Sequence, residues 1–376
     1  MKRISFLIPV LAGAIFGQVF AEGESPVSVI NTVRVGYDDN PYRNAREDGS
    51  FFIEDVLDVA FRAALSERTD FMTKMQLRLD SDDREKGFYP NIYGKLSHSV
   101  SSRLLLQLSD TLKTGSRNGD VGNSDDRVDY WRNTTELTAD YILNDKTRLG
   151  ASVGHTEEDD DPGANRFDFS RNDFGVSVSR ELQPQQTSLG LYYYRSLVNY
   201  DENPDYDMDS VYAQLTHTFS PEWNAYVLGG ATRTDRTANK KDSTDPKVGV
   251  GIAFLPSPRT EISADVSVSH AQTDNTNYGG QDDREIRFGV RHDLTGRITL
   301  TSTLRYRNSQ YDTQDYTGTG TARDTEDDRY DWDTRLRYKL NRMHSLEAGY
   351  KYARKESDTT DNWTQNRVDL GWRVEF

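Results

Sequence analysis

The sequence lacks several features that would define a fold or a chemistry. It has no cysteine, which excludes a disulfide framework and thiolate chemistry. Only 35% of its residues are hydrophobic, and the mean hydropathy is -0.81. The longest apolar run, Ile4 to Phe16, falls short of the roughly 20 residues that a transmembrane helix needs. The sequence therefore predicts no membrane-spanning helix.

Acidic residues outnumber basic ones, 61 to 46, which gives a formal net charge of -15. We predict no nucleic-acid partner for such a chain, because binding nucleic acid requires Lys and Arg to neutralise phosphates. Glycine-rich phosphate loops and Cys/His metal-ligand spacings are missing, so we predict no cofactor and no bound metal. The chain is nevertheless rich in Tyr and Phe, which argues against disorder.

The N-terminus has the pattern of a secretory signal peptide. Lys2 and Arg3 precede the apolar run, and Val19-Phe20-Ala21 provides a small-residue cleavage site. We predict a signal peptide over residues 1–21 and an exported mature chain. Residues 22–376 contain no Pro/Gly/Ser linker and no shift in composition, which predicts a single domain.

The C-terminal stretch Asn366 to Phe376 alternates strictly between apolar and polar residues. One face of an extended strand would carry Val368, Leu370, Trp372, Val374 and Phe376, and the other would carry Arg367, Asp369, Gly371, Arg373 and Glu375. The pattern resembles the closing strand of bacterial outer-membrane β-barrels, whose apolar face meets lipid. This resemblance implies an assembly signal for the barrel assembly machinery, formed by Leu370, Trp372, Val374 and Phe376. The alternative is a half-buried strand in a soluble sheet.

Similar alternating segments of about ten residues recur from Val27 onward. Tight turns, such as Asn144-Asp145 and Ser220-Pro221, alternate with long polar loops. The pattern predicts an all-β, antiparallel up-and-down transmembrane barrel of about 18 strands, with 16 as the second choice. Short turns would lie in the periplasm, and long acidic loops outside the cell. Low mean hydropathy fits this fold, because only every second strand residue meets lipid.

Val33 to Asn44 (VRVGYDDNPYRN) resembles the opening strand and first loop of the beta-barrel porin family of type 2. The terminal Phe376 and the succession of hairpins support the same resemblance. The family includes outer-membrane proteins associated with exopolysaccharide export operons. The resemblance implies an outer-membrane pore and transfers no catalytic residue.

Acidic residues concentrate in the predicted loops, for example Asp38 and Asp39, Asp125 and Asp126, and Glu157 to Asp161. Their carboxylates could hold divalent cations that bridge to lipopolysaccharide phosphates, because Ca²⁺ and Mg²⁺ prefer oxygen ligands. The alternative is a solvated acidic surface, since no loop has the full ligand spacing of an EF-hand. Outer-membrane lipid and lipopolysaccharide are the expected surroundings of the barrel.

Basic residues occupy the predicted inner face of the last five strands. The candidates for pore lining are Arg287, Arg291, Arg305, Arg307, Arg335, Arg337, Lys351 and Arg373. Such a wall could form a track for anions. Equally, nearby carboxylates such as Glu285, Glu347 and Asp369 could pair with these residues across strands and only stiffen the wall.

Three functions are consistent with these patterns. A pore for small polar or anionic solutes or saccharides agrees best with the strand number, because wide barrels hold an aqueous lumen. A structural or adhesive barrel, or one associated with exopolysaccharide export, is the alternative. An outer-membrane hydrolase is the third, but the six histidines are scattered and no G-x-S-x-G motif is present. We therefore predict no catalytic residue.

Overall fold

The computed structural model describes residues 26–41, 43, 45, 49–82, 86–118, 127–160, 168–201, 205–236, 242–271, 278–313, 325–358 and 362–376. The predicted signal peptide, residues 1–21, lies outside these ranges, as does the central part of the predicted loop Thr313 to Asp328. Among the described residues, no helix has the length and apolar character needed to cross a membrane.

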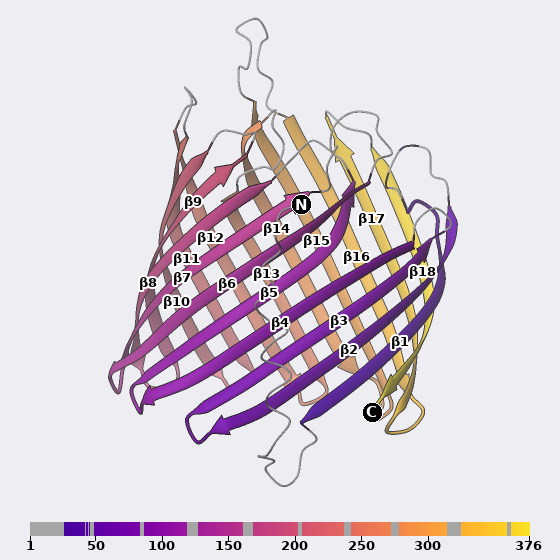
Figure 1. The fold of residues 1–376 in the computed structure, drawn as a ribbon, viewed down its shortest axis with the longest axis horizontal. Helices are drawn as coiled ribbons and strands as arrows, with labels where there is room; N and C mark the ends of the chain where they lie inside the picture. The colour runs from indigo at the N-terminus through magenta and orange to yellow at the C-terminus, as the bar shows by residue number, and fades with distance from the viewer. Residues whose placement is uncertain are drawn as a thin grey trace, which may run out of the picture.

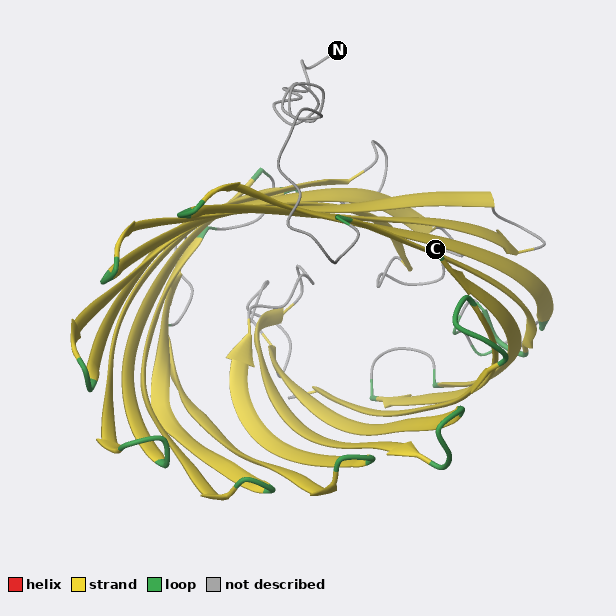
Figure 2. Ribbon diagram, turned by 90° about the horizontal axis from the view of Figure 1, so that it is seen from below, coloured by secondary structure: helices red, strands yellow, loops and turns green. Residues whose placement is uncertain are grey.

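The described chain folds into one closed, antiparallel sheet of 18 strands. Seen along the barrel, the strands form a ring (Figure 2). In chain order they are β1 (Val27–Asp38), β2 (Ser50–Ser66), β3 (Thr69–Asp82), β4 (Lys86–Ser101), β5 (Leu104–Asn118), β6 (Arg127–Asn144), β7 (Thr147–Asp160), β8 (Phe169–Gln183), β9 (Thr187–Tyr200), β10 (Tyr206–Ser220), β11 (Trp223–Arg236), β12 (Ser243–Ser257), β13 (Thr260–Ala271), β14 (Tyr278–Asp293), β15 (Ile298–Thr313), β16 (Thr325–Lys339), β17 (His344–Ser357) and β18 (Trp363–Glu375).

The first and last strands close the sheet, as the terminal alternation predicted. β1 and β18 pair antiparallel from Ile30 opposite Glu375 to Asp38 opposite Arg367. The backbone N–H of Phe376 adds a hydrogen bond to the Val29 carbonyl at 2.9 Å. Closure removes both free sheet edges, which could not be left unpaired in hydrocarbon.

Each strand presents an apolar face outward and a polar face inward. On β18, Leu370 is 66% exposed, whereas the neighbouring Asp369 is only 8% exposed. Trp372 and Phe376 are also well exposed. Val374 differs, because it is only 8% exposed and lies between Asn31 and His344 of the flanking strands. Little of its surface is therefore available to lipid.

The two rims of the barrel differ in their connections. Figure 1 shows the strands running obliquely, with tight turns gathered at one rim. The turns predicted at Asn144-Asp145 and Ser220-Pro221 join β6 to β7 and β10 to β11. Strands of 12 to 18 residues exceed the predicted ten, because the sheet continues into the predicted loops. Glu158 and Asp160, assigned to a loop from the sequence, are buried on β7.

Candidate pore lining

The inner wall carries charged side chains that water can reach. Arg287 exposes 54% of its side chain, and Arg78 and Arg132 each expose 41%. Small barrels of about eight strands fill their interior with side chains, whereas barrels of 16 to 18 strands leave room for an aqueous channel. The residue types and the strand number are typical of barrels with an aqueous interior.

The predicted basic residues lie on this inner wall, on the face opposite the exposed apolar side chains. They lie on the last five strands: Arg287 and Arg291 on β14, Arg305 and Arg307 on β15, Arg335 and Arg337 on β16, Lys351 on β17 and Arg373 on β18. Most of them contact a carboxylate, so the wall is a set of ion-pair clusters rather than a row of free cations.

Glu347 of β17 is the centre of the first cluster. Its side chain is fully buried, and it lies 2.8 Å from Arg337, 3.3 Å from Arg335 and 3.5 Å from Arg34. Three guanidinium groups around one buried carboxylate compensate for the cost of removing its charge from water. The cluster joins β16 and β17 to β1 across the closing strand.

A second buried carboxylate, Glu54 of β2, extends the network. It lies 2.5 Å from Arg34, 3.2 Å from Arg78 and 3.3 Å from Arg367. Arg34 therefore bridges Glu54 and Glu347. Sequence reasoning missed Arg34 and Arg78, because it considered only the last five strands. The signal was present, since Arg34 stands between Val33 and Val35 on the polar face of β1.

Asp369 and Glu285 complete the pairing of the predicted residues. Arg335 contacts Asp369 at 2.9 Å. Glu285 lies 2.6 Å from Arg287 and 2.5 Å from Arg305, which face each other across β14 and β15. Looser pairs join Arg307 to Asp283 at 4.0 Å and Arg373 to Glu375 at 3.6 Å.

Two of the predicted basic residues have no ion pair within 4.0 Å among the described residues. Lys351 stands opposite Asp333 on one side and Arg367 on the other. Arg291 stands opposite Glu261 and Thr301. Within the candidate set, these two cations are the least neutralised by direct contacts.

The inner wall also carries an aromatic cluster that sequence reasoning missed. Tyr212 of β10 stacks on Tyr192 of β9, with ring centroids 4.8 Å apart, and on Tyr194 at 6.1 Å. The Lys247 amine lies 4.4 Å from the Tyr212 ring. The signal was the alternation in LGLYYYRS, which puts Tyr192 and Tyr194 on the polar face with Gly190. We call Tyr192, Tyr194 and Tyr212 the tyrosine stack.

At the loop rim, Arg43 packs against the inner wall. Its guanidinium donates to the Gln365 side chain at 3.1 Å and lies 5.5 Å from the Trp363 ring. Burial lowers the pKa of Arg43, and the charge of nearby Arg329 lowers it further. Arg43 has a positive φ of 53°, which fixes the chain just after β1.

The histidines have mainly local partners. His98, His217 and His292 each contact a threonine hydroxyl at 2.8 to 2.9 Å close to a tight turn. His155 contacts Asn172 at 2.9 Å. His270 is different, because its ring lies beside Asp282 and Asp245. None of these contacts pairs a histidine with a serine nucleophile among the described residues.

Known structures share this fold. No curated protein matches the sequence. Pseudomonas aeruginosa OccK2 (OpdF) in complex with glucuronate has 12% identity and a TM-score of 0.52, with 93% of this chain and 98% of that chain covered. The P. aeruginosa outer membrane protein OpdK has 12% identity and a TM-score of 0.51, with 93% and 99% covered. A mutant of the P. aeruginosa ferric enterobactin receptor PfeA has 8% identity and a TM-score of 0.50, with 94% and 81% covered.

At such low identity these structures establish the fold alone. The barrel resembles outer-membrane channels and receptors, and the outer membrane is where such a fold resides. The family match is independent of them, and it covers β13 to β18 together with the end of β12. It does not include Val33 to Asn44, on which the predicted resemblance partly rested. Residues 251–376 match the family described as "Putative beta-barrel porin 2", which confirms the predicted family resemblance for the C-terminal part of this outer-membrane barrel.

Proposed function

We propose that this protein is a pore that passes small polar solutes across the outer membrane, with a preference for anions and acidic saccharides. The observation that carries the proposal is the closed 18-strand wall with a charged, water-exposed inner face. A solvent-free interior does not suit this wall, because it would leave the arginines desolvated at high cost.

The preference for anions rests on the two basic residues without an ion pair within 4.0 Å. Paired arginines such as Arg335 are largely neutralised by their carboxylates. Arg291 and Lys351 contribute positive charge that is not cancelled by contact, and lumen charges select ions at close range. Acidic residues at the loop rim act through water, where screening reduces their effect over about 8 to 10 Å.

The preference for saccharides rests on the tyrosine stack. In the ring of 18 strands, β9 and β10 lie half a turn away from β18 and β1. A sugar has apolar C–H faces that pack on aromatic rings, and its hydroxyl groups remain free for hydrogen bonds. Tyr194 is 38% exposed and so offers such a surface. The two cations without an ion pair lie on other strands, Arg291 on β14 and Lys351 on β17, so a passing acidic sugar would meet the tyrosine stack and the cations in turn.

Single-channel recording in planar bilayers tests both parts of the proposal. We expect discrete conductance steps from the purified protein, with transient block by galacturonate stronger than block by galactose. Tyr212→Ala should weaken block by both sugars, because it removes the central ring of the stack. The matched control is Tyr338→Ala, since Tyr338 lies on the outer face of β16. Equal block in both variants would reject the stack as a sugar contact.

Absence of any conductance from correctly folded protein would favour the structural, adhesive or export-associated barrel instead. We also propose four partners. The apolar outer face and the terminal strand suit outer-membrane lipid, lipopolysaccharide and the barrel assembly machinery, and the acidic loops suit divalent cations. A role as a hydrolase has no supporting arrangement among the described histidines and serines.

A further inference from the structure

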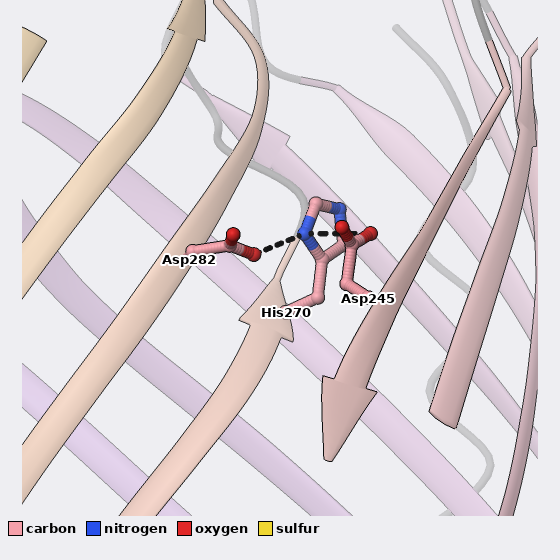
Figure 3. Close-up of side chains that lie close together, drawn as sticks. All are labelled: Asp245, His270 and Asp282. Atoms are coloured by element: carbon pink, nitrogen blue, oxygen red, sulfur yellow. Dashed lines mark hydrogen bonds and ion pairs between the residues drawn. The ribbon is translucent and has the colours of Figure 1, made fainter. Parts of the chain in front are cut away.

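Three strands bring an unusual group of side chains together near the loop rim. Asp245 comes from the start of β12, His270 from the end of β13 and Asp282 from the start of β14 (Figure 3). The backbone ladder between β12 and β13 ends at Val248 and Val268, although β12 begins at Ser243. The side chain of His270 therefore lies where these two strands are no longer joined by their backbones.

The contacts converge on one nitrogen of His270. Its Nδ1 lies 2.8 Å from an oxygen of Asp282 and 3.2 Å from an oxygen of Asp245. The His270 side chain is 1% exposed, and those of Asp245 and Asp282 are 16% and 38% exposed. All three ligand atoms lie within 4.8 Å of one another. The group is thus compact and largely shielded from water.

Protons cannot satisfy this arrangement. A neutral imidazole carries at most one proton on Nδ1, which can be directed well at only one carboxylate. The buried Oδ2 atom of Asp245 has no hydrogen-bond partner, and neither has the buried Nε2 atom of His270. A buried carboxylate oxygen left without a partner is costly, and positive charge between the three ligand atoms would satisfy it.

We propose that Asp245, His270 and Asp282 bind a divalent transition-metal ion of the zinc class. The ion would take the position of the Nδ1 proton, with one imidazole nitrogen and two carboxylate oxygens as ligands and water in the fourth position. Ligand atoms of a tetrahedral zinc site are about 3.3 Å apart, given bonds of about 2.0 to 2.2 Å. The separations of 2.8 and 3.2 Å from Nδ1 to the two carboxylates need only a small adjustment, and the carboxylate oxygens lie within 4.8 Å of each other.

The ligand set also decides the class of metal. Ca²⁺ and Mg²⁺ prefer oxygen ligands alone, whereas an imidazole nitrogen with carboxylates suits Zn²⁺ and its transition-metal neighbours. The site is separate from the basic wall and from the proposed transport function. Its structural effect would be to tie β12 to β13 and β14 beyond the last backbone pair, so metal should stabilise the loop rim.

Zinc binding to the full-length, refolded protein without a histidine tag tests the proposal. After equilibrium dialysis, elemental analysis should find about one zinc ion per chain in the wild type. His270→Ala and Asp245→Asn should each lower the affinity, measured against a chromophoric zinc indicator, by about tenfold or more. His155→Ala is the matched control, because its ring contacts only the Asn172 amide among its described partners. Equal affinities for wild type and His270→Ala, or an equal loss in His155→Ala, would overturn the proposal.

Thermal unfolding separates a binding defect from a folding defect. Asp245→Asn keeps the shape of the side chain, and its heat-modifiable migration shows whether the barrel has formed. Zinc should raise the unfolding temperature of the wild type and leave that of folded Asp245→Asn unchanged. The same concentration of Ca²⁺ should neither reproduce the stabilisation nor displace zinc. Stabilisation of both proteins by zinc, or equal stabilisation by Ca²⁺, would identify a non-specific acidic surface and refute the site.

Discussion

Replacing Glu347 with glutamine should strongly destabilise the barrel. The Glu347 side chain is 0% exposed and forms ion pairs with Arg34, Arg335 and Arg337. Glutamine has nearly the same shape but no charge, and its amide group presents hydrogens to the surrounding guanidinium groups. Arg34 would keep Glu54 and Arg335 would keep Asp369, but Arg337 would lose its only carboxylate partner among the described residues.

The expected loss follows from the burial of the carboxylate. Removing one partner of a buried ion pair typically costs about 3 to 5 kcal/mol, because the other charge is left without compensation. The three arginines are 22% to 38% exposed, so water relieves part of the repulsion. We therefore expect a loss at the lower end, about 3 kcal/mol, which is more than a hundredfold in the folding equilibrium.

Urea unfolding of the refolded protein in lipid vesicles, followed by tryptophan fluorescence, measures this loss. The matched control is Glu375→Gln, because Glu375 is 54% exposed and lies 3.6 Å from Arg373. A surface pair of this kind contributes about 0 to 1 kcal/mol. If Glu347→Gln differs from the wild type by no more than the control does, the buried cluster does not hold the closing strands together.

Two further predictions concern assembly and topology. Deleting Phe376 should lower the amount of heat-modifiable protein in the outer membrane, because it removes an exposed aromatic residue and the hydrogen bond to Val29; unchanged assembly would show that the terminal residue is dispensable. An epitope inserted near Gly318 should be labelled on intact cells and one in the turn at Pro256 should not, since short turns face the periplasm; the reverse pattern would invert the topology.

The sequence predicted the barrel well because alternation is a local property. The apolar face of each strand can be read from the sequence of that strand alone, and Pro, Asn, Asp and Gly mark the tight turns. The strand number, the closing pair and the position of the basic residues on one face all followed from this pattern. Strand length did not, because paired polar residues continue the sheet beyond the apolar band. Glu158 shows this, since it belongs to a buried strand end and not to a loop.

Alternation assigns a residue to a face but cannot name its neighbours. Glu347 and Arg34 are 313 positions apart, and only the closure of β18 on β1 brings them together. The same limit applies to His270, whose two acidic partners depend on the register of three strands. Asp110 is a further example. The alternation puts it on the outer face, but it does not show that Thr135 and Asn133 donate hydrogen bonds to its carboxylate.

In the proposed pore, charge on the inner wall governs which ions pass. The most direct test is the reversal potential of single channels in a salt gradient, compared between wild type and the double variant Arg291→Glu and Lys351→Glu. Arg284→Glu is the control, because Arg284 is on the same strand as Arg291 but on the opposite face, where it donates to Gln310. We predict an anion-selective wild type, a shift toward cations in the double variant and no shift in the control. A wild type that prefers cations, or a double variant with unchanged selectivity, would show that Arg291 and Lys351 do not set the selectivity of the pore.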